Sequence, residues 1–288
     1  MKVAREVEAL EARPRAVALG TFDGVHRGHR RVLDAAVAAG ETATAVTFDP
    51  HPRVALGYGV ELLTPLRRRL ELLEEAGIEE TLVVDFDLEV AQLDPEEFVR
   101  RVLLPIGTDV VVAGANFRFG RGRSGDLELL RRLGLDARSV PLVEGVSSTR
   151  IRDLLRAGEV ERAARLLGRP AEVDGTVVAG DARGGTLGFP TANLRPQEGL
   201  LVPGYGIYAG VADGNRAAIS IGTNPHYGGG ERRIEAFLLD FDGDLYGREL
   251  RLELWQRLRD ERAFEREAEL VAQIERDVEA TRRAEPPV

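Results

Sequence analysis

Two different patterns of apolar residues divide the chain near residue 170. Before that point, apolar runs typical of β-strands alternate with stretches in which apolar residues recur at helical spacing. The strand-like runs cover residues 15–19, 42–48, 81–86, 109–113 and 137–142. Strands that alternate with helices pair in parallel and carry helices on both faces of the sheet. The first part of the chain is therefore predicted to be an α/β domain with a doubly wound parallel sheet.

The second part of the chain has a different organisation. Its strand-like runs are short and broken by glycines, at residues 176–178, 207–211, 217–221, 234–240 and 249–254. No long helical period appears among them, which indicates a compact antiparallel β-barrel. A C-terminal helix is expected over 263–282, where Phe264, Leu270 and Ile274 recur at helical spacing. With a short helix at 160–167, we expect one domain over 1–168 and a second over 169–288.

One helix of the first domain has a recognisable start at Asp94-Pro95. Proline is favoured at the first helical position because its missing N–H costs nothing there. Glu97 lies three residues after Asp94, which is the spacing of a capping box. The pattern predicts that Asp94 caps this helix with its side chain.

Composition excludes several classes of protein. With 288 residues, 43% of them hydrophobic, the chain is long enough for two globular domains. Its formal net charge of −9 makes a nucleic-acid partner unexpected. It has no cysteine, which excludes disulfides and thiolate metal sites. No apolar run is long enough to span a membrane and the N-terminus lacks a signal-peptide core, so we expect a cytoplasmic protein without membrane contact.

The segment 20–29, Gly-Thr-Phe-Asp-Gly-Val-His-Arg-Gly-His, lies where the first long strand is expected to become a helix. In an open α/β sheet this end of a strand faces the ligand crevice. A helix that begins near Gly28 offers unpaired N–H groups to an anion, and His26 and His29 can donate hydrogen bonds to phosphate oxygens. The alternative is two surface histidines on a loop. Because two of the four histidines in the chain fall in this segment, a polyphosphate site is the favoured interpretation.

Two further loops follow predicted strands of the same domain. One carries Asp49 and His51, each followed by a proline, although Asp-Pro strings are often simple turns. The other carries Asn116, which can both donate and accept, between a glycine and two phenylalanines. Phe117 and Phe119 could flank a planar ring, and at least one of them is expected to belong to the core.

The string 147–152, Ser-Ser-Thr-Arg-Ile-Arg, opens the next predicted helix. Serine commonly caps a helix, which would explain Ser147 or Ser148 without any function. The same hydroxyl and N–H groups, with Arg150 or Arg152, would also form a second anion site.

These segments resemble the HxGH signature of the nucleotidyltransferase superfamily, whose sheet is Rossmann-like. The longer string 20–29 is similar to that of the prokaryotic FAD synthetases, which join an FMN adenylyltransferase to a riboflavin kinase. The resemblance implies that His26 and His29 are catalytic and bind the triphosphate of ATP. It also implies nucleotide binding by Gly20, Phe22, Asp23, Gly28, Ser148, Thr149 and Arg152, and flavin binding by Asp49, His51, Asn116, Phe117 and Arg118.

The second domain has its own cluster at 180–193, rich in glycine and ending Pro-Thr-Ala-Asn. It is not a Walker loop, and glycine-rich strings in β-proteins are usually turns. The Pro-Thr-Ala-Asn ending resembles the riboflavin kinase signature. This implies that Thr191 and Asn193 bind Mg²⁺ and nucleotide phosphate, together with Gly180 and Gly188. Hydroxyl and amide oxygens are suitable ligands for magnesium.

Glu235 aligns with the carboxylate that takes the proton of the ribityl 5′-hydroxyl in the riboflavin kinases. Glu249 is the nearest competitor for that role. Two positions depart from the family pattern: Gly185 stands where arginine is frequent, and His226-Tyr227 stand where Thr-Phe is frequent.

The predicted function is a pair of Mg²⁺-dependent reactions, from riboflavin and ATP to FMN, and from FMN and ATP to FAD and pyrophosphate. A nucleotidyltransferase with another acceptor is the first alternative, and the barrel with its Pro-Thr-Ala-Asn ending counts against it. A flavin-binding regulator without activity is the second, and Thr191, Asn193 and Glu235 together count against that. An RNA-binding or structural protein is disfavoured by the acidic charge. The oligomeric state is left open.

Overall fold

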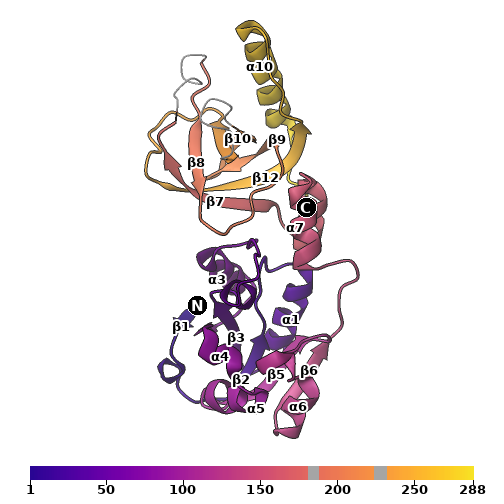
Figure 1. Cartoon of the computed structure of the whole chain (residues 1–288). Helices are drawn as coiled ribbons and strands as arrows, with labels where there is room; N and C mark the ends of the chain where they lie inside the picture. Colours follow the sequence, from indigo (N-terminus) through magenta and orange to yellow (C-terminus); the bar gives the residue numbers. More distant parts are fainter. Residues whose placement is uncertain (181–187, 224–231) are drawn as a thin grey trace. The chain divides into compact units, whose positions relative to one another are not determined.

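The computed structural model describes residues 1–180, 188–223 and 232–288 (Figure 1). The chain forms two compact units, residues 1–61 with 66–147, and residues 62–65 with 148–288. Helices α7 (Ser148–Arg156) and α8 (Val160–Leu167) lie in the second unit, because their apolar residues share one core with the barrel strands. This division differs from the expected boundary after residue 168, which would place both helices in the first domain.

The first unit contains a six-stranded sheet in which every neighbouring pair is parallel. Its strands are β1 (Lys2–Ala4), β2 (Arg15–Leu19), β3 (Thr42–Asp49), β4 (Glu80–Asp85), β5 (Thr108–Gly114) and β6 (Asp136–Val140). Their order across the sheet is β1-β4-β3-β2-β5-β6. The five longer strands are those that the sequence predicts. The three-residue β1 at the edge of the sheet is not among the predicted runs.

Helices cover both faces of this sheet, which confirms the doubly wound architecture. They are α1 (Arg27–Val37), α2 (Pro52–Ala55), α3 (Leu66–Glu75), α4 (Leu88–Gln92), α5 (Pro95–Phe98) and α6 (Leu127–Arg132), with short turns at Val7–Ala9 and Arg121–Arg123. Alternate residues of a strand point to opposite faces. Accordingly Ala16 and Ala18 pack in one apolar cluster with residues of α1 and α3, while Val17 and Leu19 pack in another with residues of α5 and α6.

Helix α5 begins at Pro95 as expected, but the predicted capping box is wrong. Asp94 occupies the N-cap position without accepting a hydrogen bond from the helix. Its carboxylate pairs instead with Arg121 at 2.7 Å, and Glu97 pairs with Arg100 and Arg101. A guanidinium forms a stronger, charge-assisted bond with a carboxylate than a backbone N–H does. The helix then continues as a π-helical turn, Val99–Leu103.

The second unit contains a closed barrel whose paired strands are all antiparallel, as expected. Its strands are β7 (Ala171–Val178), β8 (Ala192–Pro196), β9 (Gly206–Ala212), β10 (Asn215–Thr223), β11 (Arg232–Leu238) and β12 (Glu249–Arg259). The closed order is β10-β11-β8-β7-β12-β9. Ile234 and Ala236 on β11 are fully buried in the core, whereas Glu235 between them is partly exposed on the outside. Strand β8 is not among the predicted runs.

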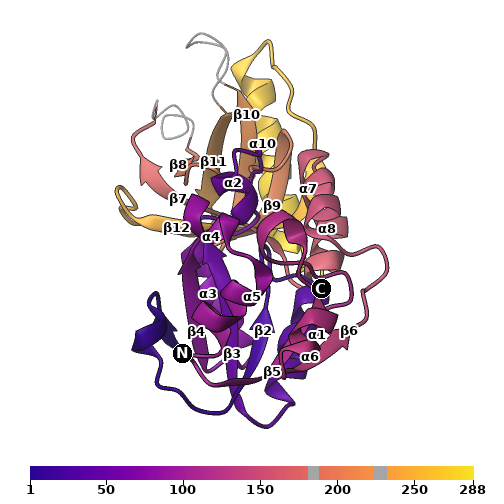
Figure 2. The same cartoon turned by 60° about the horizontal axis from the view of Figure 1, so that its bottom comes forward.

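The C-terminal helix α10 (Glu267–Arg283) lies against β9 and β10 (Figures 1 and 2). The face that it buries is polar, because its buried residues are Gln273, Asp277 and Thr281. Arg259 of β12 forms a bidentate ion pair with Asp277, and Arg216 of β10 donates to the carbonyl of Thr281. The apolar residues at helical spacing are only half-buried. The helix is therefore held by paired charges and hydrogen bonds, which apolar periodicity does not reveal.

No helix in the part of the chain that the structure describes is both long enough and apolar enough to cross a lipid bilayer.

Candidate active sites

The carboxyl end of β2 lies at the point where the strand order of the sheet reverses. Strand β3 flanks β2 on one side and β5 flanks it on the other. Crossovers in the two directions leave a crevice outside the strand ends at such a point, and ligands of open α/β sheets bind there. The segment 20–26 leaves β2 at this position and leads into α1 at Arg27. The fold therefore places the histidine segment where the sequence predicts a ligand.

The loop between β2 and α1 is tightly folded. Phe22, Gly24 and Val25 have positive φ angles of 51°, 83° and 35°. Such angles are uncommon for residues with a side chain, and they persist only where the surrounding structure holds the backbone in place. A Cβ at Gly20 would lie 3.2 Å from the Phe22 ring, and a Cβ at Gly28 would lie 3.1 Å from His26 Cε1. The two glycines thus allow the rings of Phe22 and His26 to pack directly on the backbone.

The two histidines form one unit. His26 is the N-cap of α1, and its Nδ1 accepts a hydrogen bond from the backbone N–H of His29 at 3.2 Å. The imidazole rings are stacked, with centroids 3.6 Å apart and an angle of 12° between planes, and the edge of Phe22 contacts His29. Because Nδ1 of His26 accepts, its proton is assigned to Nε2, which makes Nε2 a hydrogen-bond donor.

His29 is a neutral imidazole at physiological pH. Burial, the neighbouring His26 and the positive charge of Arg69, in that order, hold the pKa of His29 well below its ordinary value. Its Nδ1 is buried and has no hydrogen-bond partner among the described residues. A neutral imidazole donates one hydrogen bond without carrying a charge. His29 can therefore bind a phosphate oxygen as a dipolar donor rather than as a cation.

The loop after β3 brings Asp49 and His51 to the same edge of the sheet. His51 is the N-cap of α2, where its Nδ1 accepts from the backbone N–H of Arg53 at 3.1 Å. The carboxylate of Asp49 accepts from Arg5 at 3.1 Å and lies 4.0 Å from Arg69 on its other oxygen. Both predicted flavin residues thus have defined positions, each at the end of a strand that neighbours β2.

Arg5 and Arg69 are not among the predicted site residues. Arg69 lies on α3, and its side chain is almost fully buried. The sequence carries a signal for it, because Arg69 falls between Leu66 and Leu73 at spacings of three and four residues, on the apolar face of the helix. An arginine on an apolar face must find hydrogen-bond partners inside the protein.

The loop after β5 carries Asn116, Phe117 and Arg118. Phe119 is buried and contacts Phe98, so this phenylalanine belongs to the core, as one of the two was expected to do. Phe117 stacks against Phe119 with a centroid distance of 5.8 Å and remains half-buried. Asn116 and Arg118 are exposed, and Arg118 donates to the carbonyl of Phe117. Arg118 also lies 4.0 Å from the carboxylate of Asp126, so both polar residues are exposed while the aromatic pair and this ion pair fix the loop.

Helix α7 begins at Ser148, in the unit that contains the barrel. Ser148 and Thr149 occupy its first two positions, and Arg152 lies one turn later among the buried residues of the helix. A helix start with two hydroxyl residues and an arginine has the donors that an anion needs.

On the barrel, strand register brings predicted kinase residues together. Asn193 of β8 pairs with Glu235 of β11, and Glu235 pairs with Ser220 of β10 on its other side. Residues directly opposite in an antiparallel pair lie on the same face, with Cβ atoms about 5 Å apart. Thr191 lies two residues before Asn193. The outer face of the barrel thus carries the amide of Asn193, the carboxylate of Glu235 and the hydroxyl of Ser220 in one row across three strands.

Gly180 determines where the amide of Asn193 can lie. A Cβ at Gly180 would be 2.1 Å from Asn193 Nδ2 and 2.6 Å from Oδ1, which is far inside van der Waals contact. The asparagine side chain therefore packs directly over the glycine backbone. Gly188 has a φ angle of 87°, in the left-handed region that favours glycine. Gly185, Asn224, Pro225, His226 and Tyr227 lie outside the described residues.

Glu235 and Glu249 have different surroundings. The Glu235 carboxylate lies 3.4 Å from Arg233 and is about one third exposed, at 32%. Glu249 of β12 pairs with Thr176 of β7 and accepts a hydrogen bond from its hydroxyl at 2.7 Å. Of the two glutamates, only Glu235 lies directly opposite Asn193 in the strand register. The geometry therefore favours Glu235 over Glu249 as the carboxylate that works with Asn193.

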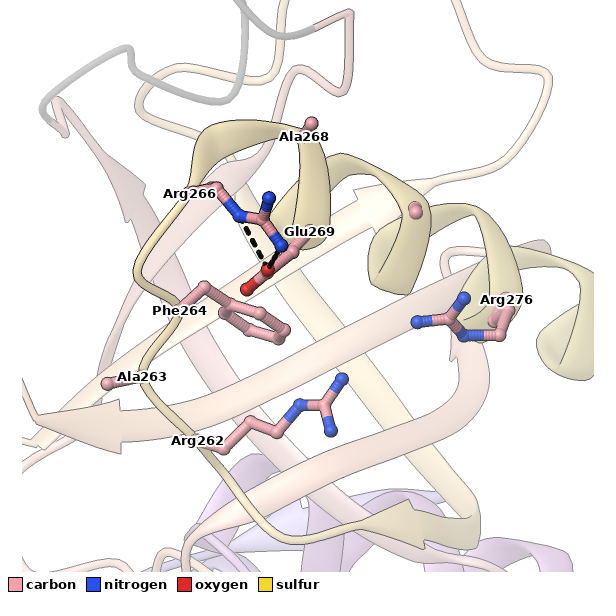
Figure 3. A pocket seen from close by; sticks show the side chains of 8 residues that line it. Arg262, Ala263, Phe264, Arg266, Ala268, Glu269 and Arg276 are labelled. Atoms are coloured by element: carbon pink, nitrogen blue, oxygen red, sulfur yellow. Dashed lines mark hydrogen bonds and ion pairs between the residues drawn. The ribbon is translucent and has the colours of Figure 1, made fainter.

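An open hollow of about 480 Å³ lies between the loop after β12 and the first turns of α10 (Figure 3). Arg262 and Arg276 both donate to the side-chain oxygen of Gln273, at 2.7 and 2.8 Å, and Arg262 lies over the Phe264 ring. The guanidinium groups are thus engaged in fixing α10. The hollow contains none of the predicted catalytic or binding residues, and we assign it no part in either reaction.

Over the described ranges, no group of three or more histidine, aspartate or glutamate side chains is arranged to hold a metal ion.

Comparison with known proteins matches both units. A family model described as FAD synthetase matches residues 9–151, and one described as riboflavin kinase matches residues 167–284. A bifunctional riboflavin kinase/FMN adenylyltransferase from Listeria monocytogenes is 37% identical over 93% of this chain and 91% of that protein. The protein of the same description from Escherichia coli K12 is 35% identical over 96% of both. A crystal structure described as a macrolide-efflux protein from Streptococcus pneumoniae has a TM-score of 0.88 and 31% identity over 98% of both chains.

A parallel-sheet unit with a histidine pair at its switch point, followed by a closed barrel, defines a class of two-domain nucleotide-dependent transferases. Within that class, the two family models cover the two units in the expected order. The chain belongs to the family of bifunctional riboflavin kinase/FMN adenylyltransferases. The resemblance deduced from the sequence motifs is confirmed over nearly the whole chain.

Proposed function

We propose that the two parts of the chain divide the two activities of this family. Residues 169–288 transfer the γ-phosphoryl group of ATP to riboflavin and form FMN. Residues 1–168 transfer the AMP moiety of a second ATP to FMN and form FAD. The observation that supports this most directly is the presence of two architectures, a parallel sheet and a closed barrel, each matched by its own family model.

In adenylyl transfer, an oxygen of the FMN phosphate forms a bond to the α-phosphorus of ATP. The bond from that phosphorus to the oxygen that bridges to the β-phosphate breaks, and pyrophosphate leaves. The protein contributes positioning and hydrogen bonds to the developing charge rather than a covalent intermediate. We assign the Nε2–H of His26 and the neutral imidazole of His29 to this task.

Other residues are proposed to hold the substrates of adenylyl transfer. Ser148, Thr149 and Arg152 at the start of α7 would bind the β- and γ-phosphates. The loops after β3 and β5 would bind the flavin, since each follows the carboxyl end of a strand that flanks β2, and the histidine segment follows β2 itself. The nucleotide residues Gly20, Phe22, Asp23 and Gly28 belong to that segment.

In riboflavin phosphorylation, we assign Glu235 as the base that takes the proton of the 5′-hydroxyl as that oxygen bonds to the γ-phosphorus and ADP leaves. Asn193 lies opposite it across the strand pair, and its amide is held over Gly180. Gly180 and Gly188 would let the nucleotide phosphates approach the backbone. The guanidinium of Arg233 lies 3.4 Å from the Glu235 carboxylate.

Mg²⁺ is proposed as the metal of the kinase reaction. The donor set fits it, because Thr191 and Asn193 present a hydroxyl and an amide oxygen two residues apart. When bound, the ion would neutralise charge on the phosphates of ATP. A reaction sequence that consumes ATP and riboflavin agrees with a cytoplasmic enzyme that acts on small molecules.

The function is tested by incubating the purified protein with riboflavin, ATP and MgCl₂ and separating the flavins by chromatography. We expect FMN to appear first and FAD to follow. Formation of FMN without FAD would leave only the kinase assignment standing, and the absence of both products would reject the proposal.

Variants assign the residues. His29→Ala is expected to lower the conversion of supplied FMN to FAD by about 10²-fold, the usual effect of removing one donor to a transition-state oxyanion, while FMN formation continues. Glu235→Gln is expected to abolish FMN formation and to leave adenylyl transfer intact. Glu249→Gln is the matched control for the base. Loss of kinase activity in that control, with activity retained in Glu235→Gln, would show that the base is Glu249.

A further inference from the structure

We propose that Arg69 is a positioning residue for adenylyl transfer, which holds the histidine loop and the loop after β3 in one fixed geometry. The inference rests on the proposed adenylyltransferase activity. Arg69 lies on α3, outside every loop that the motifs single out, and acts through the backbone of those loops.

The burial of Arg69 contrasts with the exposure of Arg67 on the same helix. Arg67 and Arg68 both form ion pairs with Glu71, and Arg67 is 79% exposed. Arg69 points to the other side, where its side chain is only 2% exposed. Burying a guanidinium costs several kcal/mol unless its donors are bonded. Arg69 therefore has a local task that the exposed Arg67 does not share.

A single nitrogen of Arg69 connects the two loops. Its Nη1 donates to the carbonyl of Thr21 at 2.9 Å and to the carbonyl of Phe48 at 3.0 Å. Thr21 begins the segment that leads to His26 and His29, and Phe48 precedes Asp49 at the end of β3. The hydroxyl of Thr47 also donates to the Thr21 carbonyl, at 3.1 Å. The carboxyl ends of β2 and β3 are thus tied together at one point.

The remaining atoms of the guanidinium face the site. Its Nη2 lies 4.0 Å from the carboxylate of Asp49, a predicted flavin residue, while Arg5 holds the other oxygen of that carboxylate. Its Nε is buried and has no hydrogen-bond partner among the described residues, as is true of His29 Nδ1. Unpaired buried polar atoms are rare in folded proteins and require a specific explanation.

The charge of Arg69 also acts on the histidines. The groups that face His29 are His26 on its own loop and Arg69 from α3. Burial is the largest cause that lowers the pKa of His29, and these two groups lower it further. Asp23 and Asp49 face Arg69 and partly offset the effect of burial on its own pKa. Arg69 therefore helps to keep His29 neutral in addition to fixing the loops.

The test compares Arg69→Met, which removes both charge and hydrogen bonds, with Arg69→Lys, which keeps the charge but not the planar fork. Arg67→Met, on the exposed face of the same helix, is the matched control. FMN is supplied, and kcat and KM for FAD formation are measured from pH 5 to 9. Phosphorylation of riboflavin by the same preparation reports whether the chain is intact.

We expect Arg69→Met to lower kcat for FAD formation by about 10²-fold, the cost of misplacing reacting groups by about 1 Å, with FMN formation unchanged. The acid limb of its pH profile is expected to move to higher pH, because one cause that lowers the pKa of His29 is gone. Arg69→Lys should lose rate but keep the limb in place, and Arg67→Met should behave as the wild type.

Several results would overturn the inference. The first is a kcat for FAD formation in Arg69→Met that is within about threefold of the wild-type value. The second is an equal loss of FAD formation and FMN formation. The third is a loss of FAD formation that is the same at every pH. The last two would show that Arg69 serves folding only. If instead the wild-type protein forms no FAD from FMN, the proposed function fails, and the two failures are therefore distinguishable.

Discussion

Gly180 lies so close to the side chain of Asn193 that a methyl group cannot be added without moving the asparagine. A Cβ at residue 180 would stand 2.1 Å from Asn193 Nδ2. Ordinary van der Waals contact begins at 3.4 Å, so the amide must move by about 1.3 Å, the difference between these two distances. A displacement of that size at a group that positions substrate costs about 10²-fold in rate. Gly180→Ala is therefore expected to lower kcat for riboflavin phosphorylation by that factor.

The assay follows FMN formation from riboflavin at saturating ATP, and FAD formation from supplied FMN in parallel. Only the first should fall, because Gly180 and Asn193 both belong to the barrel unit. Gly214→Ala is the matched control, since no atom lies within 4 Å of a Cβ there. Its φ of 83° makes the alanine strained, so the control should lose about 1 kcal/mol of stability without losing activity. Full kinase activity in Gly180→Ala would refute the argument that Asn193 must occupy its present position.

Two further predictions concern the sheet unit. Because the pKa of His29 is lowered in the folded state, His29 binds a proton less readily in the folded chain than in the unfolded chain. The free energy of unfolding should therefore fall as the pH drops below about 6.5, by at most about 1.4 kcal/mol per pH unit. Urea unfolding at pH 5 and pH 7.5 measures this, and a His29→Asn variant with an undiminished pH dependence would contradict it. Arg15 is fully buried and bonded to Glu80 at 2.7 and 2.9 Å, so Glu80→Ala should destabilise the sheet unit by about 3–5 kcal/mol through an uncompensated buried charge. The Arg15→Met/Glu80→Leu double variant should recover most of that loss in the same urea titration, and a double variant as unstable as Glu80→Ala would show that the charge is not the cause.

Local patterns in the sequence predicted much of the architecture. Four of the five longer strands of the sheet, β2 to β5, bury a run of residues that is visible without tertiary information, whereas β6 buries only Ala137. The strands that escaped prediction are β1, which has only three residues, and β8, whose sequence Ala-Asn-Leu-Arg-Pro contains no apolar run. Such strands are defined by the partners with which they pair rather than by their own residues. Their hydrogen-bond partners come from distant segments, so their own composition carries little signal.

Charged side chains account for two further differences between the sequence patterns and the structure. Asp94 has the sequence of a helix cap and pairs with Arg121 instead, 27 residues away. Helix α10 has an apolar period, yet buries Gln273 and Asp277 against the arginines of the barrel. With 39 basic residues, the chain offers many possible partners to each carboxylate. The choice among them depends on which arginine the fold brings near, and local sequence does not contain that information.

The order of residues along the chain determined the chemical identity of both sites, because each signature is a short contiguous string whose glycines, hydroxyls and imidazoles must be neighbours to act together. Tertiary structure alone decided how those strings are supported. Arg69 reaches back across 48 residues to the carbonyl of Thr21, and Glu235 meets Asn193 through the register of two strands. The physical reason is that hydrogen bonds and ion pairs act over a few ångströms in space, whereas a sequence records only distance along the chain.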